Sequence, residues 1–186
     1  MCGKVIAQKE YDYSTTSGSP GPLLRQTNTS YAWQSPNPNY STYLSNNMMN
    51  LVYSSQTTDG TNQMAYTQYG HDETATIASG MGASQNLETA VWTCTHRGNQ
   101  TSENRWRNLP TVQTLTSTTN YYDTGMPSVA KDPLLNATTY SYSSTFQDAY
   151  VTQVKNTLNQ SAYINYDYNT GLLTSTTDPN SIGLGL

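Results

Sequence analysis

The chain is poor in charge, in aliphatic side chains and in cysteine, and each scarcity excludes a class of protein. Only 11% of its 186 residues are charged, with 8 Lys or Arg against 12 Asp or Glu, so we expect no nucleic-acid partner. Hydrophobic residues reach 34%, against about 45–50% in an average soluble domain. This excludes a helical bundle and an α/β enzyme with Val- and Ile-rich parallel strands.

Two further absences concern membranes and metal sites. No apolar run is long enough for a membrane-spanning helix, and residues 1–10 show no apolar segment of a signal peptide. The two cysteines, Cys2 and Cys94, are too few for a disulfide framework or a zinc site, and whether they pair is left open. We expect no cofactor and no metal ion.

Tyrosine and threonine take the place of the missing aliphatic residues. The chain has 16 Tyr, 3 Trp and 1 Phe, together with about thirty Thr. Both dominant residues favour pleated, half-buried strands, and a tyrosine can bury its ring while its hydroxyl stays in water. The composition therefore predicts a thin β-sheet that is polar on both faces.

Repeats near the C-terminus organise this sheet. Thr124-Gly125 recurs as Thr170-Gly171, and Asp132-Pro133 recurs as Asp178-Pro179, both at an offset of 46 residues. A middle copy around residues 155–159 divides the offset into two units of about 20–26 residues, within the range of solenoid repeats. We align Tyr140-Ser141-Tyr142 with Tyr166-Asp167-Tyr168, and residues 143–150 form an insertion. The recurring residues are Tyr122, Asp123, Gly125, Asp132, Pro133, Tyr140, Tyr142, Tyr166, Asp167, Tyr168, Gly171, Asp178 and Pro179.

Each unit predicts a strand, a glycine turn, a second strand and an Asp-Pro break. Glycine supplies the positive φ of the turn, and proline has no N–H to donate to a ladder. The fold class is therefore all-β, an antiparallel meander in an open curved sheet, with one domain over 1–186. The repeats are clearest over 118–181 and looser over 1–117. Strands are expected at 23–33, 51–53, 64–69, 90–95, 111–119, 137–142 and 172–177, and a loop or one short helix at 72–90.

The stretch from Tyr166 to Pro179 resembles the YD repeat of bacterial Rhs proteins. Residues 97–125, with Arg97-Gly98-Asn99 and Arg105-Trp106, are similar to the region that enters a YD array. The resemblance implies a β-sheet wound into a hollow shell, as in the Tc-toxin cocoon and teneurins. In bacterial members the shell encloses a toxic C-terminal domain. Nothing matches the family's self-cleaving core segment, and Ser181 stands where the repeat usually has Gly. The resemblance thus implies a partial stretch of wall.

Two clusters have side chains typical of catalysis. His71-Asp72-Glu73 with His96 could bind a metal or transfer protons, but neighbouring strand residues point to opposite faces. A polar loop is the preferred interpretation. Cys94 and His96 share one face of an expected strand, without an oxyanion donor, so a structural cysteine is preferred. We expect no enzymatic activity.

The remaining candidates have structural interpretations and binding alternatives. Asp132 and Asp178 are expected to cap turns, with a sugar or Ca²⁺ contact as the alternative. The arginine cluster around Trp106 could bind an anion or stack on the ring, although arginine stems covering the indole are preferred. We expect rings of neighbouring units to stack, with a sugar-binding platform as the alternative. These rings belong to Tyr122, Tyr142, Tyr166 and Tyr168, and the arginines are Arg97, Arg105 and Arg107.

The expected function is structural, as a segment of a YD-repeat shell that encloses a toxin or effector. The expected partners are the remaining repeats and the C-terminal domain of a larger parent protein, secreted or at the cell surface. The alternative is a cell-surface module that binds carbohydrate or mediates adhesion. Neither end shows an obvious charged or proline-blunted strand, so self-association through open sheet edges is also expected.

Overall fold

Twelve strands and two short helices make up the described part of the chain. The computed structural model describes residues 3–34, 36–80, 96–108, 111–180 and 183–185. The strands are Ala7–Tyr11 (β1), Leu23–Tyr31 (β2), Val52–Thr58 (β3), Gln63–His71 (β4), Gln100–Arg107 (β5), Gln113–Tyr121 (β6), Pro127–Lys131 (β7), Ala137–Tyr142 (β8), Val151–Lys155 (β9), Ser161–Tyr166 (β10), Leu173–Thr177 (β11) and Gly183–Gly185 (β12). The helices are Tyr40–Ser45 (α1) and the 3₁₀ turn Ser144–Phe146 (η1).

The strands follow one another in the sheet in chain order, from β1 to β12. In the hairpins from β1 to β4 and from β6 to β12, neighbouring strands run antiparallel. Within the described residues β1 has only β2 as a neighbour and β12 has only β11, so the sheet is open. The prediction of an all-β antiparallel meander is confirmed.

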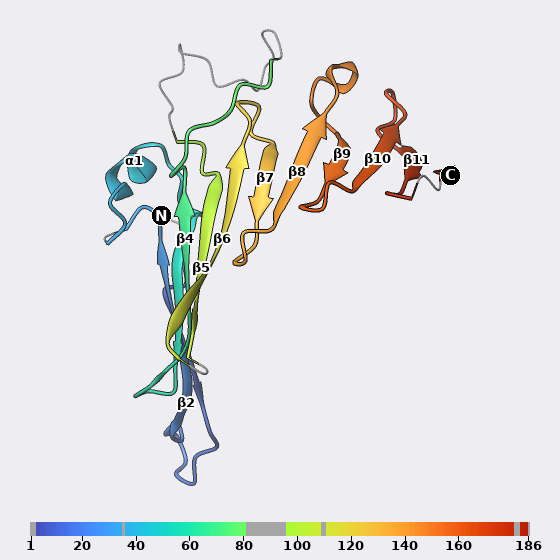
Figure 1. The fold of residues 1–186 in the computed structure, drawn as a ribbon. Helices are drawn as coiled ribbons and strands as arrows, with labels where there is room; N and C mark the ends of the chain where they lie inside the picture. The colour runs from blue at the N-terminus through green and yellow to red at the C-terminus, as the bar shows by residue number, and fades with distance from the viewer. Residues whose placement is uncertain (1–2, 35, 81–95, 109–110, 181–182, 186) are drawn as a thin grey trace. The chain divides into compact units, whose positions relative to one another are not determined.

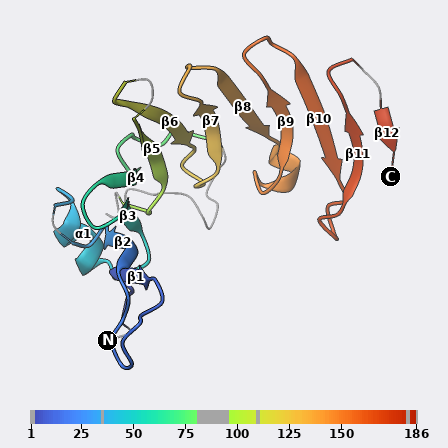
Figure 2. The ribbon, with the colours of Figure 1, turned by 90° about the horizontal axis from the view of Figure 1, so that it is seen from below.

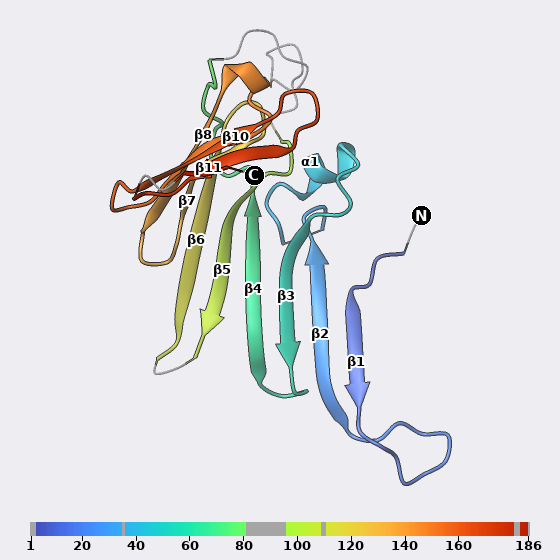
Figure 3. The same ribbon diagram turned by 90° about the vertical axis from the view of Figure 1, so that its right-hand side faces the viewer.

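The chain divides into two compact units. One comprises Met1–His71 with Ser102–Thr116, and Figure 3 shows β1 to β4 of this unit side by side. The other comprises Asp72–Thr101 with Ser117–Leu186, and Figure 2 shows its strands β8 to β11 side by side. Neither helix of the described ranges has the length and apolar character needed to cross a bilayer.

The expected strands and the observed strands differ at several places. The sequence placed a strand at 137–142, where β8 lies, but it named none over β1, β5, β7 or β9, and it missed α1. Trp106 is the one apolar residue of β5, so no hydrophobic alternation marks the strand, and its place in the sheet outweighs its composition. Residues 72–80 form a loop, with one bridge between Ile77 and Tyr122. Cys2, Cys94, Ser181 and the strand expected at 90–95 lie outside the described residues.

Helix α1 lies in the connection between β2 and β3 (Figure 1). Its Tyr43 is only 1% exposed, and the phenol hydroxyl donates a hydrogen bond to the carbonyl oxygen of His71 at 2.9 Å. Tyr43 and Ala32 are the fully buried hydrophobic residues of the described chain. The helix is therefore held by one buried aromatic anchor, because six residues are too few for an independent helix.

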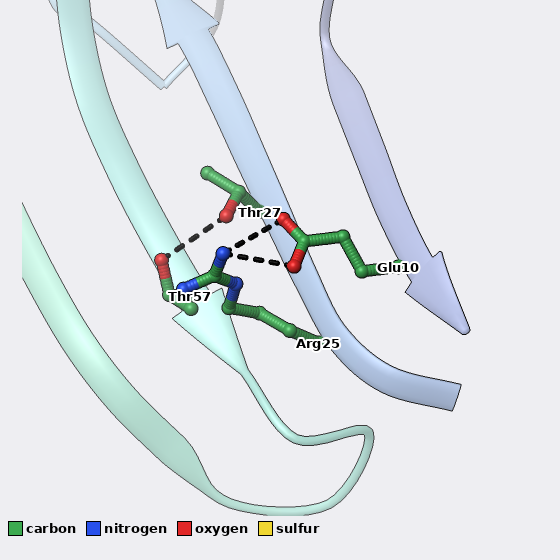
Figure 4. Close-up of polar contacts among 4 residues, drawn as sticks. All are labelled: Glu10, Arg25, Thr27 and Thr57. Carbon is green, nitrogen blue, oxygen red and sulfur yellow. Dashed lines mark hydrogen bonds and ion pairs between the residues drawn. The ribbon is translucent and has the colours of Figure 1, made fainter. Parts of the chain in front are cut away.

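Polar pairs between strands take the place of an apolar core. All seven residues of β3 and all six of β8 are half-buried, so neither strand alternates between a buried and an exposed face. Hydroxyl groups of Ser30 and Ser54 pair across β2 and β3 at 2.6 Å. Figure 4 shows a hydroxyl pair of Thr27 with Thr57 at 3.2 Å. The thin polar sheet predicted from composition is present, and such cross-strand pairs contribute roughly 0.2–1 kcal/mol each.

Candidate functional site

A tyrosine ends five of the strands, and the pairing register shifts directly before each one. In every case the tyrosine lies opposite the first residue of the next strand, and the second residue of that strand has no partner opposite. This is a β-bulge, which increases the local twist of a hairpin. The pairs are Tyr11 with Leu23, Tyr31 with Val52, Tyr121 with Pro127, Tyr142 with Val151 and Tyr166 with Leu173. We call this arrangement the tyrosine corner.

One backbone hydrogen bond recurs at four of these corners. The residue after the tyrosine donates its N–H to the carbonyl oxygen of the residue just before the next strand. The distances are 2.9 Å for Asp12 to Pro22, 2.8 Å for Ala32 to Leu51, 2.8 Å for Tyr122 to Met126 and 2.8 Å for Asp167 to Leu172. The same corner therefore forms in both halves of the chain, including the half in which the sequence repeat is loose.

Three corner tyrosines also hold the strand on their other side through the phenol hydroxyl. Tyr31 donates to the carbonyl of Val5 at 3.1 Å, Tyr121 to Gln100 at 2.9 Å and Tyr142 to Pro127 at 2.9 Å. Burial raises the pKa of Tyr142 to about 12, and burial followed by the charge of Asp72 raises the pKa of Tyr121. Each of these tyrosines therefore joins three successive segments of the sheet.

The corners correct the alignment of the tyrosines in the sequence repeat. Tyr121 is equivalent to Tyr166, whereas the offset of 46 residues aligns Tyr122 with Tyr168. Tyr142 is equivalent to Tyr166 rather than to Tyr168. The turn after β6 is one residue shorter than the turn after β10, and tyrosines stand at neighbouring positions, so the sequence alone did not fix the register. Each turn nevertheless has a glycine two residues before the next strand.

A side chain lies close to each of the two turn glycines. Gly125 has φ +83°, and Nη2 of Arg97 lies 3.1 Å from the position that a β-carbon would take. Arg97 also donates from Nη1 to the carbonyl oxygen of Asp123 at 2.5 Å. Gly171 has φ +69°, and the hydroxyl oxygen of Tyr150 lies 2.5 Å from its would-be β-carbon. Glycine is needed here for both its conformation and its lack of a side chain.

Turns at the other ends of the strands share an Asx cap. Oδ1 of Asp132 accepts the backbone N–H groups two and four residues later, both at 2.9 Å. Oδ1 of Asn156 accepts from the same two positions, both at 3.0 Å. The fourth residue of each turn has a left-handed backbone, at φ 66° for Leu135 and 60° for Asn159. Asp178 accepts the N–H two residues later at 2.9 Å. This is the turn role expected of Asp132 and Asp178.

Two further turns use the same chemistry. Oδ1 of Asp59 accepts the N–H groups of Thr61 and Asn62 at 2.9 and 2.7 Å. Hydrogen bonds from Asn62 lower the pKa of Asp59 to about 2. In the turn after β10, Oδ1 of Asp167 accepts from Thr170 at 2.8 Å, which lowers the pKa of Asp167. The carboxylate form of each aspartate is the one that stabilises its turn.

The tyrosine rings expected to stack between neighbouring units form one pair and belong to one cluster. Tyr122 and Tyr142 meet edge to face at 5.8 Å. The segment that contains η1 then brings two further rings against the corner tyrosine of β10. We call the resulting group, Phe146, Tyr150, Tyr166 and Tyr168, the aromatic cluster. Its rings stack at 4.9 Å between Tyr150 and Tyr166 and at 6.3 Å between Phe146 and Tyr168.

The acidic residues after β4 fasten the loop that precedes β5. Asp72 accepts N–H groups of Gly98 and Asn99 with its two carboxylate oxygens at 2.8 and 2.9 Å. The carboxylate of Glu73 accepts a hydrogen bond from the hydroxyl of the buried Thr101 at 3.0 Å. A polar cavity of about 260 Å³ lies beside them, lined by residues 72–76, 97 and 99. Across the described ranges, no group of three or more His, Cys, Asp or Glu could hold a metal ion.

Two of the arginines expected to cluster with Trp106 contact different groups. Arg97 binds the turn after β6, and Arg105 pairs with Glu103 at 2.8 Å. Arg105 and Arg107 are exposed on β5 and point away from the half-buried Trp106, because neighbouring strand residues face opposite sides. The expectation that arginine stems cover the indole stays a prediction.

No model of a known protein family matches the chain, and no curated protein matches it. The functional interpretation therefore depends on the recurring geometry of the chain itself.

Substituting Tyr142 by Phe should weaken the sheet, because the carbonyl of Pro127 loses its hydroxyl donor while the ring remains. We expect the free energy of unfolding, measured with urea, to fall by about 1 kcal/mol. The pKa of Tyr142 is raised from 10.0 to about 12, so stabilisation is complete below pH 10 and is lost as pH rises through 12. Tyr13→Phe is the control, since Tyr13 is 97% exposed. Equal effects of the two substitutions would contradict the role of the hydroxyl.

Replacing Asp132 by Ala should destabilise the β7–β8 turn more than replacing it by Asn, which keeps one acceptor oxygen. Hydrogen bonds from the Asn136 side chain and backbone lower the pKa of Asp132. Its stabilisation is therefore complete above the pKa of the unfolded carboxyl and is lost as pH falls through the folded pKa. We expect urea midpoints to separate wild type from Asp132→Ala at neutral pH and to converge towards pH 2. A gap of constant size would argue against the carboxylate cap.

Proposed function

We propose that this chain is a stretch of YD-repeat wall that encloses a toxin or effector domain of a larger protein. The recurrence of the tyrosine corner from Tyr11 to Tyr166 is the observation that supports it most directly. One corner repeated at successive hairpins lets a single meander extend by adding identical units. A wall needs this kind of growth, whereas a catalytic domain needs a unique site.

The thin sheet also favours a wall over a closed domain. Within the described ranges the only fully buried hydrophobic residues are Ala32 and Tyr43, so neither unit has a sizeable apolar core of its own. Polar contacts across strands and half-buried tyrosines let both faces of the sheet meet water. A sheet of this kind can separate a cargo from its surroundings by continuous strand pairing, with no catalytic residue.

The proposal makes the remaining repeats of the parent protein the partners of the two sheet edges, and places the wall outside the cell or at its surface. β1 carries Lys9 and Glu10, so this edge strand is charged, contrary to the expectation from sequence. Glu10 is neutralised by Arg25 at 2.8 Å, as Figure 4 shows. Charge on β1 therefore opposes pairing with another strand only in part.

The register of β1 tells which of its amides face the open edge. Thr29 donates its N–H to the carbonyl of Ile6 at 2.9 Å, so this pair is a hydrogen-bonded one. Hydrogen-bonded and non-hydrogen-bonded pairs alternate along an antiparallel ladder. The backbone of Gln8 is therefore hydrogen-bonded to that of Thr27 on β2, whereas the backbone N–H of Ala7 points away from β2.

Ala7→Pro should block pairing at this edge while leaving the β1–β2 ladder intact. Light scattering with size-exclusion chromatography should show a wild-type mass that rises with concentration. Ala7→Pro should limit association to dimers through the remaining edge, with an unchanged β-rich circular dichroism spectrum. Gln8→Pro, the matched control, removes a ladder bond and should lower the melting temperature. A wild-type monomer with a sharp, reversible melt at micromolar concentration would overturn the proposal.

A second candidate, carbohydrate binding, is favoured by one observation. Tyr168 is 59% exposed and stacks on Phe146, so the aromatic cluster presents a ring face to solvent. If the cluster binds sugars, a glycan array should give saturable binding that Tyr168→Ala abolishes. Tyr13→Ala, which removes an exposed ring of β1–β2, should leave that binding unchanged. Absence of glycan binding by the folded wild type would eliminate this candidate.

A further inference from the structure

The first unit contains a cavity lined by residues outside the recurring hairpin contacts. It has a volume of about 580 Å³ and lies where the segment before β1 meets the connection between β2 and β3. Small-molecule sites usually have volumes of roughly 300–1,000 Å³ and mostly apolar walls. The side chains that matter for its chemistry are Lys4, Ile6, Trp33, Leu44, Met49 and Asn50.

The indole of Trp33 forms a fixed wall of this cavity. Its Nε1–H donates to the carbonyl oxygen of Met49 at 3.2 Å, and its ring stacks on Tyr31 with centroids 6.3 Å apart and planes 17° apart. Tyr31 is itself a corner tyrosine, held by its hydroxyl bond to Val5. The orientation of this wall is therefore set by the sheet before any ligand arrives.

Helix α1 also contributes an apolar side chain to the lining of the cavity. The side chain of Tyr43 is only 1% exposed, and its hydroxyl donates a hydrogen bond to the carbonyl oxygen of His71. This contact anchors the helix. Leu44, the next residue, lines the cavity and remains 44% exposed. Ile6 also lines the cavity and is 56% exposed. These side chains expose apolar surface that a ligand could cover.

Lys4 gives the cavity its charge. Its ammonium group donates to Oδ1 of Asn50 and lies 6.0 Å from the centre of the Tyr31 ring. Both contacts are with uncharged groups, and no acidic residue lines the cavity. A half-buried cation beside an apolar hollow favours a ligand that carries a negative charge at one end.

We propose that this cavity binds an apolar monocarboxylate. Its aryl or alkyl body would lie among Trp33, Leu44 and Met49, and its carboxylate would accept hydrogen bonds from Lys4. The cavity lies wholly within the first unit, so this inference is independent of the proposed wall function. It assigns the chain a ligand in addition to its structural role.

Three probes with one apolar body and different ends test the proposal on the full chain. They are 4-phenylbutyrate, 4-phenylbutan-1-ol and 4-phenylbutylammonium. Binding is followed by NMR at the indole N–H signal of Trp33, which Trp33→Phe identifies among the 3 tryptophans. We expect a saturable shift with the acid, an affinity about fivefold lower for the alcohol, and the weakest binding for the amine.

Two variants show whether Lys4 causes the preference. Lys4→Gln should bind acid and alcohol equally. The matched control Lys9→Gln removes a lysine of β1, outside the cavity lining, and should keep the fivefold preference. Leu44→Asp, at an exposed position of α1, should reverse the preference towards the amine. Circular dichroism confirms that each variant is folded.

The proposal is overturned by either of two results. One is the absence of a saturable Trp33 shift with 4-phenylbutyrate in folded wild type. The other is a preference for the acid that Lys4→Gln retains or that Lys9→Gln removes equally, since the charge would then act from elsewhere on the chain.

Discussion

Hydrogen bonding between neighbouring strands is the interaction on which this structure depends. The hydrophobic effect usually dominates folding, but here the fully buried hydrophobic residues of the described ranges are Ala32 and Tyr43. Each strand must therefore obtain its stability from the strands on both sides. This explains the strict chain order of the sheet, because any other order would require long connections with nothing to pack against.

The tyrosine corner helps to stabilise a sheet that has few apolar side chains. Its bulge lies where the chain leaves one strand for the next, and at three corners its hydroxyl donates to the segment on the other side. Tyr142 does both, and its ring meets that of Tyr122 edge to face. An aliphatic residue could not supply the hydroxyl bond. Five of the 16 tyrosines of the chain stand at such corners.

Two of the lengthened connections add surface that could bind a ligand. Helix α1 replaces a tight turn between β2 and β3 and, with Trp33, completes the apolar cavity. The segment with η1 replaces a tight turn between β8 and β9 and brings Phe146 into the aromatic cluster. A meander of similar hairpins gains specific surfaces where a connection lengthens, because binding residues are carried mostly by loops.

The sequence was sufficient to predict the turn residues, but it did not predict the strand register or the positions of β5 and α1. Gly125, Gly171 and Asp132 act within a few residues of their own positions, so composition and spacing indicated their turns, and the Tyr- and Thr-rich composition indicated the thin all-β sheet. The register of Tyr121, the strand β5 and the helix α1 were decided only in the tertiary structure. Pairing with distant strands selects one of two adjacent tyrosines and places β5 between β4 and β6. The buried hydrogen bond of Tyr43 to His71 anchors a helix that its local sequence does not favour.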